Sequence, residues 1–363
     1  MTAASVDTRM SNPLVSICLP TYNRGSQLRE NLETVLGQDY EPMEVVISDN
    51  ASTDDTEQVC RALAASDARV RYFRQSTNSG VHANHNFCVE QARGEFICFL
   101  HDHDERDLRI VSAYAAFLQE HPEVGVVCSD WELIDEDGRV IGVREHDVKE
   151  VTPGLEYIDQ AIRSGRSSIG IPAAMVRREA LGNARMGLDA PTGFADFVLW
   201  FEVAERWAVG HIPKRLWRWR QQPASLSART VETLCGHYRT NIMNYCDSHL
   251  MRWPEHAGLV ARWRSAARNY LFWALVYEVG LYCRKPSADR VKSGHASLPE
   301  ILNYRLSPGD VALVIEQLRA YRTGAVQHVV FATLMGLLRL RLTWPIAFAT
   351  EYQSSLRTLL GLK

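Results

Sequence analysis

The sequence has no closely spaced cysteine pair and little net charge, and both absences exclude classes of function. Its eight cysteines are scattered without a Cys-x-x-Cys pair, and Cys18 and Cys98 lie inside apolar runs. This pattern is typical of reduced core cysteines and argues against a zinc ribbon or a disulfide framework. The formal net charge is −3 over 363 residues, so no global basic field predicts a nucleic-acid partner.

The sequence also lacks an apolar segment long enough to predict a membrane span. The longest uncharged stretch near the C-terminus, 323–338, has 16 residues and includes Gln327 and His328. A spanning helix needs about 20 mostly apolar residues. Residues 1–12 lack the apolar core of a secretory signal, so we expect a cytoplasmic protein.

Short apolar runs alternate with helical patterns over the first third of the chain. The runs are 14–19, 44–48, 70–73 and 95–100. This alternation predicts an α/β fold with a doubly wound, mostly parallel sheet. Right-handed crossovers place the strand ends at one edge, where an open α/β sheet binds its ligand.

A glycine-rich phosphate cradle is missing from the loop after the first run. Neither Gly-x-Gly-x-x-Gly nor Gly-x-x-x-x-Gly-Lys-[Ser/Thr] occurs there, so a diphosphate has to be bound in another way. Asp102 and Asp104 directly follow the run 95–100. Two carboxylates at a strand end can hold a divalent cation that a phosphate reaches, and the alternative is a polar turn with solvated charge.

Four segments together resemble the family-2 glycosyltransferases of GT-A fold, in order and at the usual spacing. They are 15–24 (VSICLPTYNR), 45–55 (VVISDNASTDD), 78–80 (NSG) and 92–104 (ARGEFICFLHDHD). The resemblance implies a Rossmann-like nucleotide-diphospho-sugar transferase that uses Mn²⁺ or Mg²⁺. It implies inverting transfer from a UDP- or dTDP-sugar to a hydroxyl of a glycan, lipid-linked or small-molecule acceptor, in surface polysaccharide biosynthesis.

The resemblance also implies roles for the donor-side residues. Tyr22 offers a ring face to a base, and the Asp49 carboxylate accepts a hydrogen bond from a base N–H. Ser52 contacts the ribose or, as an alternative, caps the following helix. The full set expected to bind the nucleotide-sugar is Pro20, Thr21, Tyr22, Asn23, Arg24, Asp49, Asn50, Ser52, Asn86, Asp102 and Arg220.

The metal is expected at the Asp-x-Asp pair. Asp104 binds it directly, and Asp102 contacts the ribose, a metal-bound water or the metal itself. Many relatives carry a histidine where this chain has Gln222, which makes Gln222 a candidate for a weaker third ligand. Because side chains alternate along an extended chain, we expect His103 to point away from the two carboxylates, and the alternative is that His103 is itself a ligand.

The general base is expected at Asp196, within 192–200 (TGFADFVLW). An inverting transfer needs only one base, so the replacement of a usual first acid by Ala195 is compatible with catalysis. The alternative makes Asp196 a charge at a helix N-terminus. On the acceptor side we expect Trp131, for which a core position is the alternative, and the loop residues Ser168, Ile169 and Gly170.

These patterns predict a tail at 1–12, a GT-A domain at 13–225 and a helical region at 226–363. The helical region is a lid, a homodimer interface or a peripheral docking surface for the inner face of the cell membrane. A non-catalytic sugar-binding or scaffold protein of the same fold is an alternative function, because Ala195 and Gln222 depart from the family pattern. A nucleotidyltransferase is the other alternative.

Overall fold

The computed structural model divides the chain into two compact units. It describes residues 12–146, 148–187, 195–220, 237–283, 315–316, 318–321 and 324–339. Within these, the first unit holds residues up to 157 together with 168–187 and 199–220. The second unit holds 158–167, 195–198 and the described residues from 237 onward.

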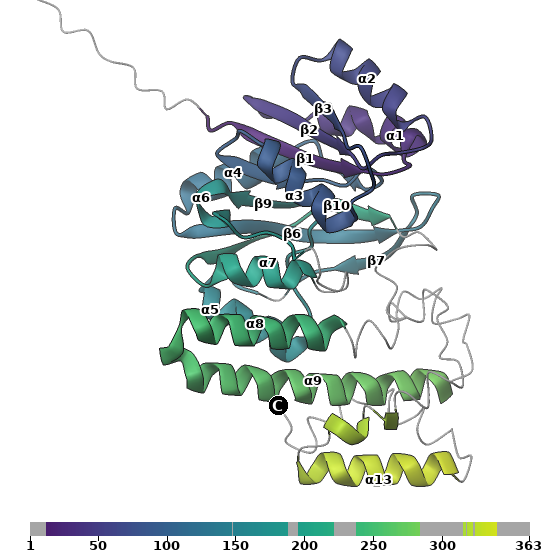
Figure 1. The fold of residues 1–363 in the computed structure, drawn as a ribbon, viewed down its shortest axis with the longest axis vertical. Coiled ribbons are helices and arrows are strands. Elements are labelled where there is room, and N and C mark those ends of the chain that lie inside the picture. The colour runs from purple at the N-terminus through teal and green to yellow at the C-terminus, as the bar shows by residue number, and fades with distance from the viewer. Residues whose placement is uncertain are drawn as a thin grey trace, which may run out of the picture. The chain divides into compact units, whose positions relative to one another are not determined.

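One mixed sheet forms the framework of the first unit (Figure 1). Within the described residues its strands are β1 (Val15–Thr21), β2 (Met43–Asp49), β3 (Val70–Arg74), β4 (Phe96–Phe99), β5 (Glu105–Arg106), β6 (Val124–Ile134), β7 (Val140–Arg144), β8 (Val151–Thr152), β9 (Ala174–Arg177) and β10 (Ala208–Arg220). The strand order is β3-β2-β1-β4-β9-β6-β10-β5, while β7 pairs with β6 and β8 pairs with β10.

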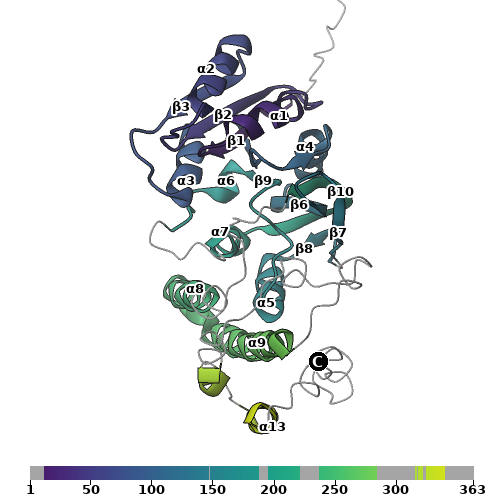
Figure 2. The same ribbon diagram turned by 90° about the vertical axis from the view of Figure 1, so that its right-hand side faces the viewer.

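The helices in the described residues are α1 (Gly25–Leu36), α2 (Thr56–Ser66), α3 (Val81–Gln91), α4 (Ile110–Glu120), α5 (Gly154–Ser164), α6 (Arg178–Leu181), α7 (Ala195–Ala204), α8 (Arg239–Arg252), the 3₁₀ turn η2 (Pro254–His256), α9 (Ala257–Cys283) and α13 (Ala325–Arg339). Helices α1, α2 and α3 alternate with the first four strands as predicted, whereas α8, η2, α9 and α13 follow the last strand. Figure 2 shows α3 and α4 on opposite faces of the sheet. The expected α/β fold with a mostly parallel sheet is confirmed.

The parallel register of the first four strands brings their polar ends together. β1 pairs with β2 from Val15 opposite Met43 to Thr21 opposite Asp49. β4 lies on the other side of β1, with Phe99 opposite Cys18. Every residue of these three strands is buried, as expected for strands covered on both faces. The loops that follow Thr21, Asp49 and Phe99 therefore emerge at one edge.

The cysteines of the described core are reduced, as predicted. Cys18, Cys60, Cys88, Cys98, Cys128 and Cys246 are buried and unpaired. Burial raises the pKa of the Cys98 thiol to about 12. These side chains fill the core as small apolar groups.

The second unit is helical, as predicted for much of the C-terminal third. α8 packs against α9 through aromatic contacts, with the His249 and Trp263 ring centroids 4.9 Å apart. The Tyr238 hydroxyl donates to the Ile162 carbonyl over 2.8 Å. Among the described helices, none is both long enough and apolar enough to cross a bilayer. The loop predicted at 286–310 lies outside the described residues.

Candidate active site

The Asp-x-Asp pair lies in an irregular turn directly after β4. The Leu100 N–H donates to the Cys18 carbonyl and extends the β1–β4 pairing by one step. The chain then leaves the sheet, and 101–104 form neither strand nor helix. Asp102 and Asp104 are only 5% and 3% exposed. Two carboxylates this deeply buried require hydrogen bonds or a cation, because desolvation penalises their charge.

Asp102 is fixed by hydrogen bonds to both carboxylate oxygens. The Thr21 hydroxyl, from the end of β1, donates to Oδ2 over 2.7 Å. His103 Nδ1 lies 2.9 Å from Oδ1. The Asn31 side chain of α1 donates to the Asp102 carbonyl. Asp102 is therefore held in one orientation by β1, by α1 and by the turn itself.

Asp104 differs because one of its oxygens has no partner. The backbone N–H of Arg220 donates to Oδ1 over 2.9 Å. Oδ2 is buried and accepts no hydrogen bond from the described residues. Burial raises the pKa of this carboxyl above its ordinary value. A buried carboxylate oxygen without a donor is a place for a proton or a metal ion.

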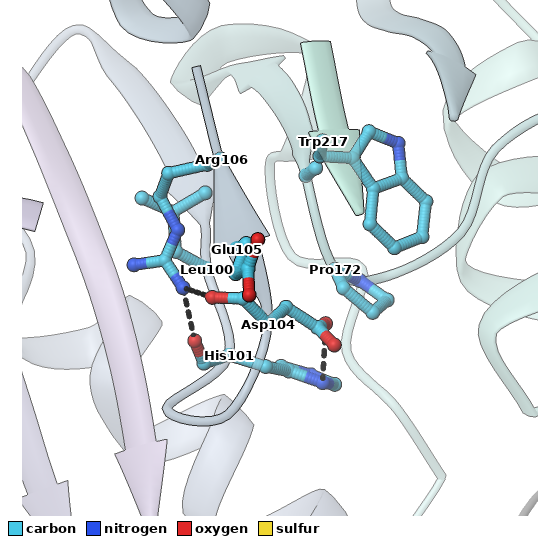
Figure 3. Close-up of a pocket in the computed structure, with 8 residues that line it drawn as sticks. Leu100, His101, Asp104, Glu105, Arg106, Pro172 and Trp217 are labelled. Carbon is cyan, nitrogen blue, oxygen red and sulfur yellow. Dashed lines mark hydrogen bonds and ion pairs between the residues drawn. The ribbon is translucent and has the colours of Figure 1, made fainter. Parts of the chain in front are cut away.

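His101 faces this oxygen with a nitrogen that is also an acceptor. His85 Nδ1 lies 2.8 Å from the Val81 carbonyl and must carry the proton, so His85 Nε2 accepts from His101 Nε2 over 3.2 Å. That leaves His101 Nδ1 unprotonated, 4.0 Å from Asp104 Oδ2 (Figure 3). Burial lowers the pKa of His101, which keeps the ring neutral. Two acceptors facing each other fit a bound cation.

The expectation that His103 points away from the carboxylates is wrong. Its Nε2 lies 3.8 Å from Asp104 Oδ1, while its Nδ1 contacts Asp102. The alternation of side chains fails here because the turn at 101–104 is not extended. One imidazole nitrogen each of His101 and His103 and one carboxylate oxygen of Asp104 lie within 4.8 Å of one another. The donor set therefore combines carboxylate and imidazole.

The buried Arg106 side chain stabilises the turn at 101–104 through hydrogen bonds to its backbone. Its Nη2 donates to the carbonyls of His101 and Asp104 (Figure 3), while Nη1 is buried without a partner among the described residues. A small pocket lies beside it. The pocket is lined by Leu100, His101, Asp104, Glu105, Arg106, Pro172, Ala173 and Trp217.

Arg220 was expected to bind the donor, but its side chain is occupied by the protein. Nε donates to the His103 carbonyl, Nη1 donates to the carbonyls of Asp135 and Glu136, and Nη2 pairs with Glu105. The guanidinium thus joins the turn at 101–104 to the β6–β7 hairpin. The backbone N–H of Arg220 positions Asp104 by donating to its Oδ1.

The loops after β1 and β2 bind each other. The Asn23 N–H donates to the Ser52 hydroxyl over 2.9 Å, and Asn23 Oδ1 accepts from the Thr53 N–H. Asn23 adopts φ 52°, a left-handed conformation that asparagine tolerates better than most residues. The Ser52 hydroxyl therefore stabilises the loop 22–24. Asp55, the residue before α2, makes no side-chain capping hydrogen bond. Tyr22 remains 43% exposed at the rim.

Asp49 is fully buried at the end of β2. Its Oδ1 accepts from the Ser52 N–H over 2.8 Å, and its Oδ2 accepts from the Tyr72 hydroxyl over 2.9 Å. Burial and the Asp49 carboxylate both raise the pKa of Tyr72. Arg74 Nε also lies 3.8 Å from Oδ2. These contacts orient the carboxylate, and Oδ1 retains a lone pair for a further donor.

Three asparagines connect the remaining loops, and one of them was not predicted from the sequence. Asn50 donates to Asn78 Oδ1 and accepts from the Ser79 N–H. Asn86, expected to bind the donor, exchanges two hydrogen bonds with the Met186 backbone. The missed residue is Asn84, which is buried and donates to the carbonyls at the ends of β1 and β2. No pattern in the sequence distinguishes it.

The other expected residues are spread over both units. Pro20 is buried in β1, and the Arg24 N–H donates to the Thr56 hydroxyl. Asp196 lies in the first turn of α7, half-buried, and its Oδ1 accepts from the Phe197 N–H. This is the position of a carboxylate at the start of a helix. Gln222 lies outside the described residues.

Two of the expected acceptor-side residues, Trp131 and Gly170, lie beside an aromatic group. Trp131 is partly buried, and its ring centroid lies 5.2 Å from that of Trp217 and 5.5 Å from that of Trp219. Ile169 is buried. A Cβ at Gly170 would lie 3.7 Å from the Trp217 ring. Trp131 is therefore a packing residue that keeps part of its ring accessible.

This arrangement of strand-end loops matches a known family. The sequence profile of glycosyl transferase family 2 matches residues 16–183. The chain carries a family-2 glycosyltransferase domain. The resemblance of the four segments to family-2 enzymes of GT-A fold is thereby confirmed, and so is the assignment of the chain to the glycosyltransferases.

Relatives and solved structures agree with this assignment. An uncharacterized protein of Mycobacterium tuberculosis is 29% identical over 63% of this chain and 73% of its own length. A GalNAc(5)-diNAcBac-PP-undecaprenol beta-1,3-glucosyltransferase of Campylobacter jejuni is 38% identical over 26% of this chain, a match that spans only 30% of that relative. The structure of S. aureus TarS 1–349 in complex with UDP-GlcNAc matches 94% of this chain and 91% of its own, with a TM-score of 0.56 at 18% identity. That last likeness concerns the fold.

Proposed function

We propose that this family-2 glycosyltransferase is metal-dependent and transfers a sugar, with inversion, from a nucleotide-diphosphate donor to a hydroxyl acceptor. The observation that carries the proposal is the unpartnered, buried Oδ2 of Asp104, which faces the unprotonated His101 Nδ1 at 4.0 Å. A protein that only bound sugars would have no need for two facing acceptors at a strand end. A divalent cation resolves this arrangement.

The residues of the turn fit such a cation. Asp104, His101 and His103 would hold it, with Asp102 beside them. Mn²⁺ accepts both oxygen and imidazole ligands, which favours it over Mg²⁺. When bound, the cation neutralises charge on the departing diphosphate. The local histidines also make a ligand from Gln222 unnecessary.

The loops after β1 and β2 would bind the nucleoside. Asp49 is oriented by Ser52 and Tyr72, with a lone pair of Oδ1 left to accept from a uracil-type N–H. Tyr22, exposed at the rim, offers a ring face to the base. We favour a UDP-sugar, in agreement with the UDP-GlcNAc complex of TarS, whose fold is shared.

Asp196 would act as the general base. An inverting displacement requires one carboxylate to accept the proton of the attacking hydroxyl, and no covalent intermediate forms. Asp196 is half-buried at the start of α7, and the N-terminal end of a helix favours the ionised form. The C. jejuni relative, by its name, acts on an undecaprenol-linked glycan. We propose an acceptor of that class, which places the enzyme in surface polysaccharide assembly.

Two isosteric variants test this assignment separately. Asp196→Asn should abolish transfer or donor hydrolysis and leave the Kd for UDP with Mn²⁺ nearly unchanged. Asp104→Asn should abolish the Mn²⁺-dependent part of UDP binding. Wild-type turnover by Asp196→Asn would exclude this residue as the base. Equal UDP affinity of the Asp104→Asn variant and the wild type, with Mn²⁺ present, would exclude the metal site.

A further inference from the structure

A second cluster of potential metal ligands lies on the far part of the sheet. It consists of Asp130 on β6, His211 on β10 and His146 in the segment after β7. Asp130 and His211 are only 5% and 2% exposed, whereas the His146 side chain is 18% exposed. One ligand atom from each residue lies within 4.8 Å of the other two.

The three residues converge on a single carboxylate oxygen. His211 Nε2 lies 2.9 Å from Asp130 Oδ1, and His146 Nδ1 lies 3.2 Å from the same atom. The His146 backbone N–H also donates to it, over 2.9 Å. A carboxylate oxygen has about two lone-pair sites, so three nitrogens crowd it. Two ring nitrogens are directed at one carboxylate oxygen. A cation bound between them can take the place of the protons that the ring nitrogens share with that oxygen.

The fold constructs this convergence from three separate segments. β10 pairs with β6 so that His211 lies opposite Cys128 and Ile212 opposite Ser129, but Asp130 lies opposite Arg215. Two residues of β10, Pro213 and Lys214, are therefore inserted without partners. Such a bulge redirects the neighbouring side chains. His146 arrives from the segment that leaves β7, the strand paired with the far end of β6.

The cluster is separate from the candidate active site. The contact with Asp104 is made by the backbone of Arg220, five residues beyond Arg215 on the same strand. At about 3.3 Å per residue, five residues of extended strand span roughly 16 Å. A cation at Asp130 is therefore too distant to contact the same diphosphate.

We propose that Asp130, His146 and His211 bind one divalent cation of the zinc class. Two imidazoles and one carboxylate are a common protein ligand set for Zn²⁺, which accepts nitrogen and oxygen ligands at about 2.1 Å. Ligands at that distance and a tetrahedral angle are about 3.4 Å apart. The observed 2.9 and 3.2 Å need to open only slightly. The partly exposed His146 side provides the entry path and the position for a water ligand.

The bound cation has a structural consequence. His146 precedes β8, whose Val151 and Thr152 pair with β10. A metal that joins His146 to His211 and Asp130 fixes the segment between β7 and β8 to the sheet. It also fixes the bulge at 213–214, beside the aromatic group around Trp131 and Trp217. Metal binding should therefore stabilise the folded chain by mass action.

The test uses the full chain with both ligand clusters controlled. A His103→Asn, Asp104→Asn background disables the first cluster, and chelator-treated protein is titrated with Zn²⁺ by calorimetry and with Co²⁺ by visible absorption. We expect one equivalent to bind, a rise in Tm of several degrees and the d–d bands of a nitrogen-coordinated Co²⁺ site. His146→Ala, at a partly exposed position, should weaken binding by at least about tenfold. Asp130→Asn, which keeps the side-chain shape, should do the same.

His121→Ala provides the matched control. His121 lies beside one carboxylate, with Nδ1 3.5 Å from Glu123 Oε1, but it belongs to neither ligand cluster of the described residues. Its removal should leave Zn²⁺ binding unchanged. No saturable Zn²⁺ binding below about 100 µM would overturn the proposal, since protein zinc sites bind far more tightly. Binding that His146→Ala and Asp130→Asn both leave unaffected would overturn it as well.

Discussion

Asp104→Asn is expected to stabilise the metal-free protein while it removes metal binding. The variant keeps the size of the side chain and the acceptor for the Arg220 N–H, which lies 2.9 Å from Oδ1. It replaces the unpartnered anionic Oδ2 by an NH₂ group. That group faces His101 Nδ1, which is free to accept because the His101 proton is on Nε2.

The size of the effect follows from two opposing contributions. Relief of a buried, unsatisfied charged oxygen is worth about 1–3 kcal/mol. A neutral acceptor for the Arg220 N–H costs about 1 kcal/mol relative to a charged one. The free energy of unfolding should therefore rise by roughly 1 kcal/mol at neutral pH.

The pH dependence should change in a defined direction. Burial raises the pKa of Asp104 in the folded state, so the folded protein binds more protons than the unfolded chain between the ordinary and the raised value. Stability falls as the pH rises through that window. In Asp104→Asn this part of the decline should be absent.

Urea denaturation of metal-free protein at several pH values measures both effects, and a Tm series with Mn²⁺ measures the loss of metal binding. Asp104→Ala is the control, because it removes the charge but also the acceptor for Arg220. Destabilisation of Asp104→Asn by more than about 2 kcal/mol would show that the Asp104 charge is satisfied in the metal-free protein. A Tm increase with Mn²⁺ equal to that of the wild type would contradict the role of Asp104 in metal binding.

Three further perturbations test the framework of the site. Thr21→Val removes the 2.7 Å hydrogen bond to Asp102 and should lower the free energy of unfolding by about 1.5–3 kcal/mol in urea; an unchanged midpoint would contradict this. Burial acts to raise the pKa of Glu44, but the hydrogen-bond donors around the carboxylate outweigh burial, and the net pKa is lowered. The stabilisation by ionised Glu44 is therefore present above its ordinary pKa and is lost as the pH falls through the lowered pKa. Glu44→Gln should therefore show a smaller loss of stability on acidification, and an identical acid profile would count against it. Gly210→Ala places a Cβ 2.3 Å from the Phe117 ring and should cost about 1–3 kcal/mol in thermal unfolding, with a neutral result excluding the close packing.

The first half of the fold could be predicted because its information is local. Each apolar run from 14–19 to 95–100 is followed by turn residues and then by a helical pattern. A parallel sheet with its polar strand ends at one edge follows from that alternation. Asp49 and Asp102 were identified correctly as strand-end residues because their position in the chain fixes their position at the edge.

The second half depends on pairings that the sequence does not indicate. β10 runs through Pro213, a residue that normally argues against a central strand. This proline lies in the bulge, where β10 makes no pairing with β6. The missing N–H of proline therefore costs no hydrogen bond in the sheet. The antiparallel contact of Trp217 with Arg106 joins residues more than a hundred positions apart. No periodicity reports such a contact.

The sequence pattern also does not predict the orientation of the side chains in the turn at 101–104. His103 contacts Asp102 and lies near Asp104 because the turn departs from extended geometry. The role of Asn84 was hidden for a related reason. α3 buries His82, Asn84 and His85 among its polar residues, so its pattern lacks the apolar stripe that identifies a packed face. The roles of Asp196 and Gln222 remain predictions.

Calorimetric titration of the wild-type chain with UDP, with and without Mn²⁺, tests the metal-dependent donor site. We expect saturable UDP binding that requires Mn²⁺ and that disappears in Asp104→Asn but persists in Asp196→Asn. UDP binding of equal affinity without any divalent cation would contradict this expectation.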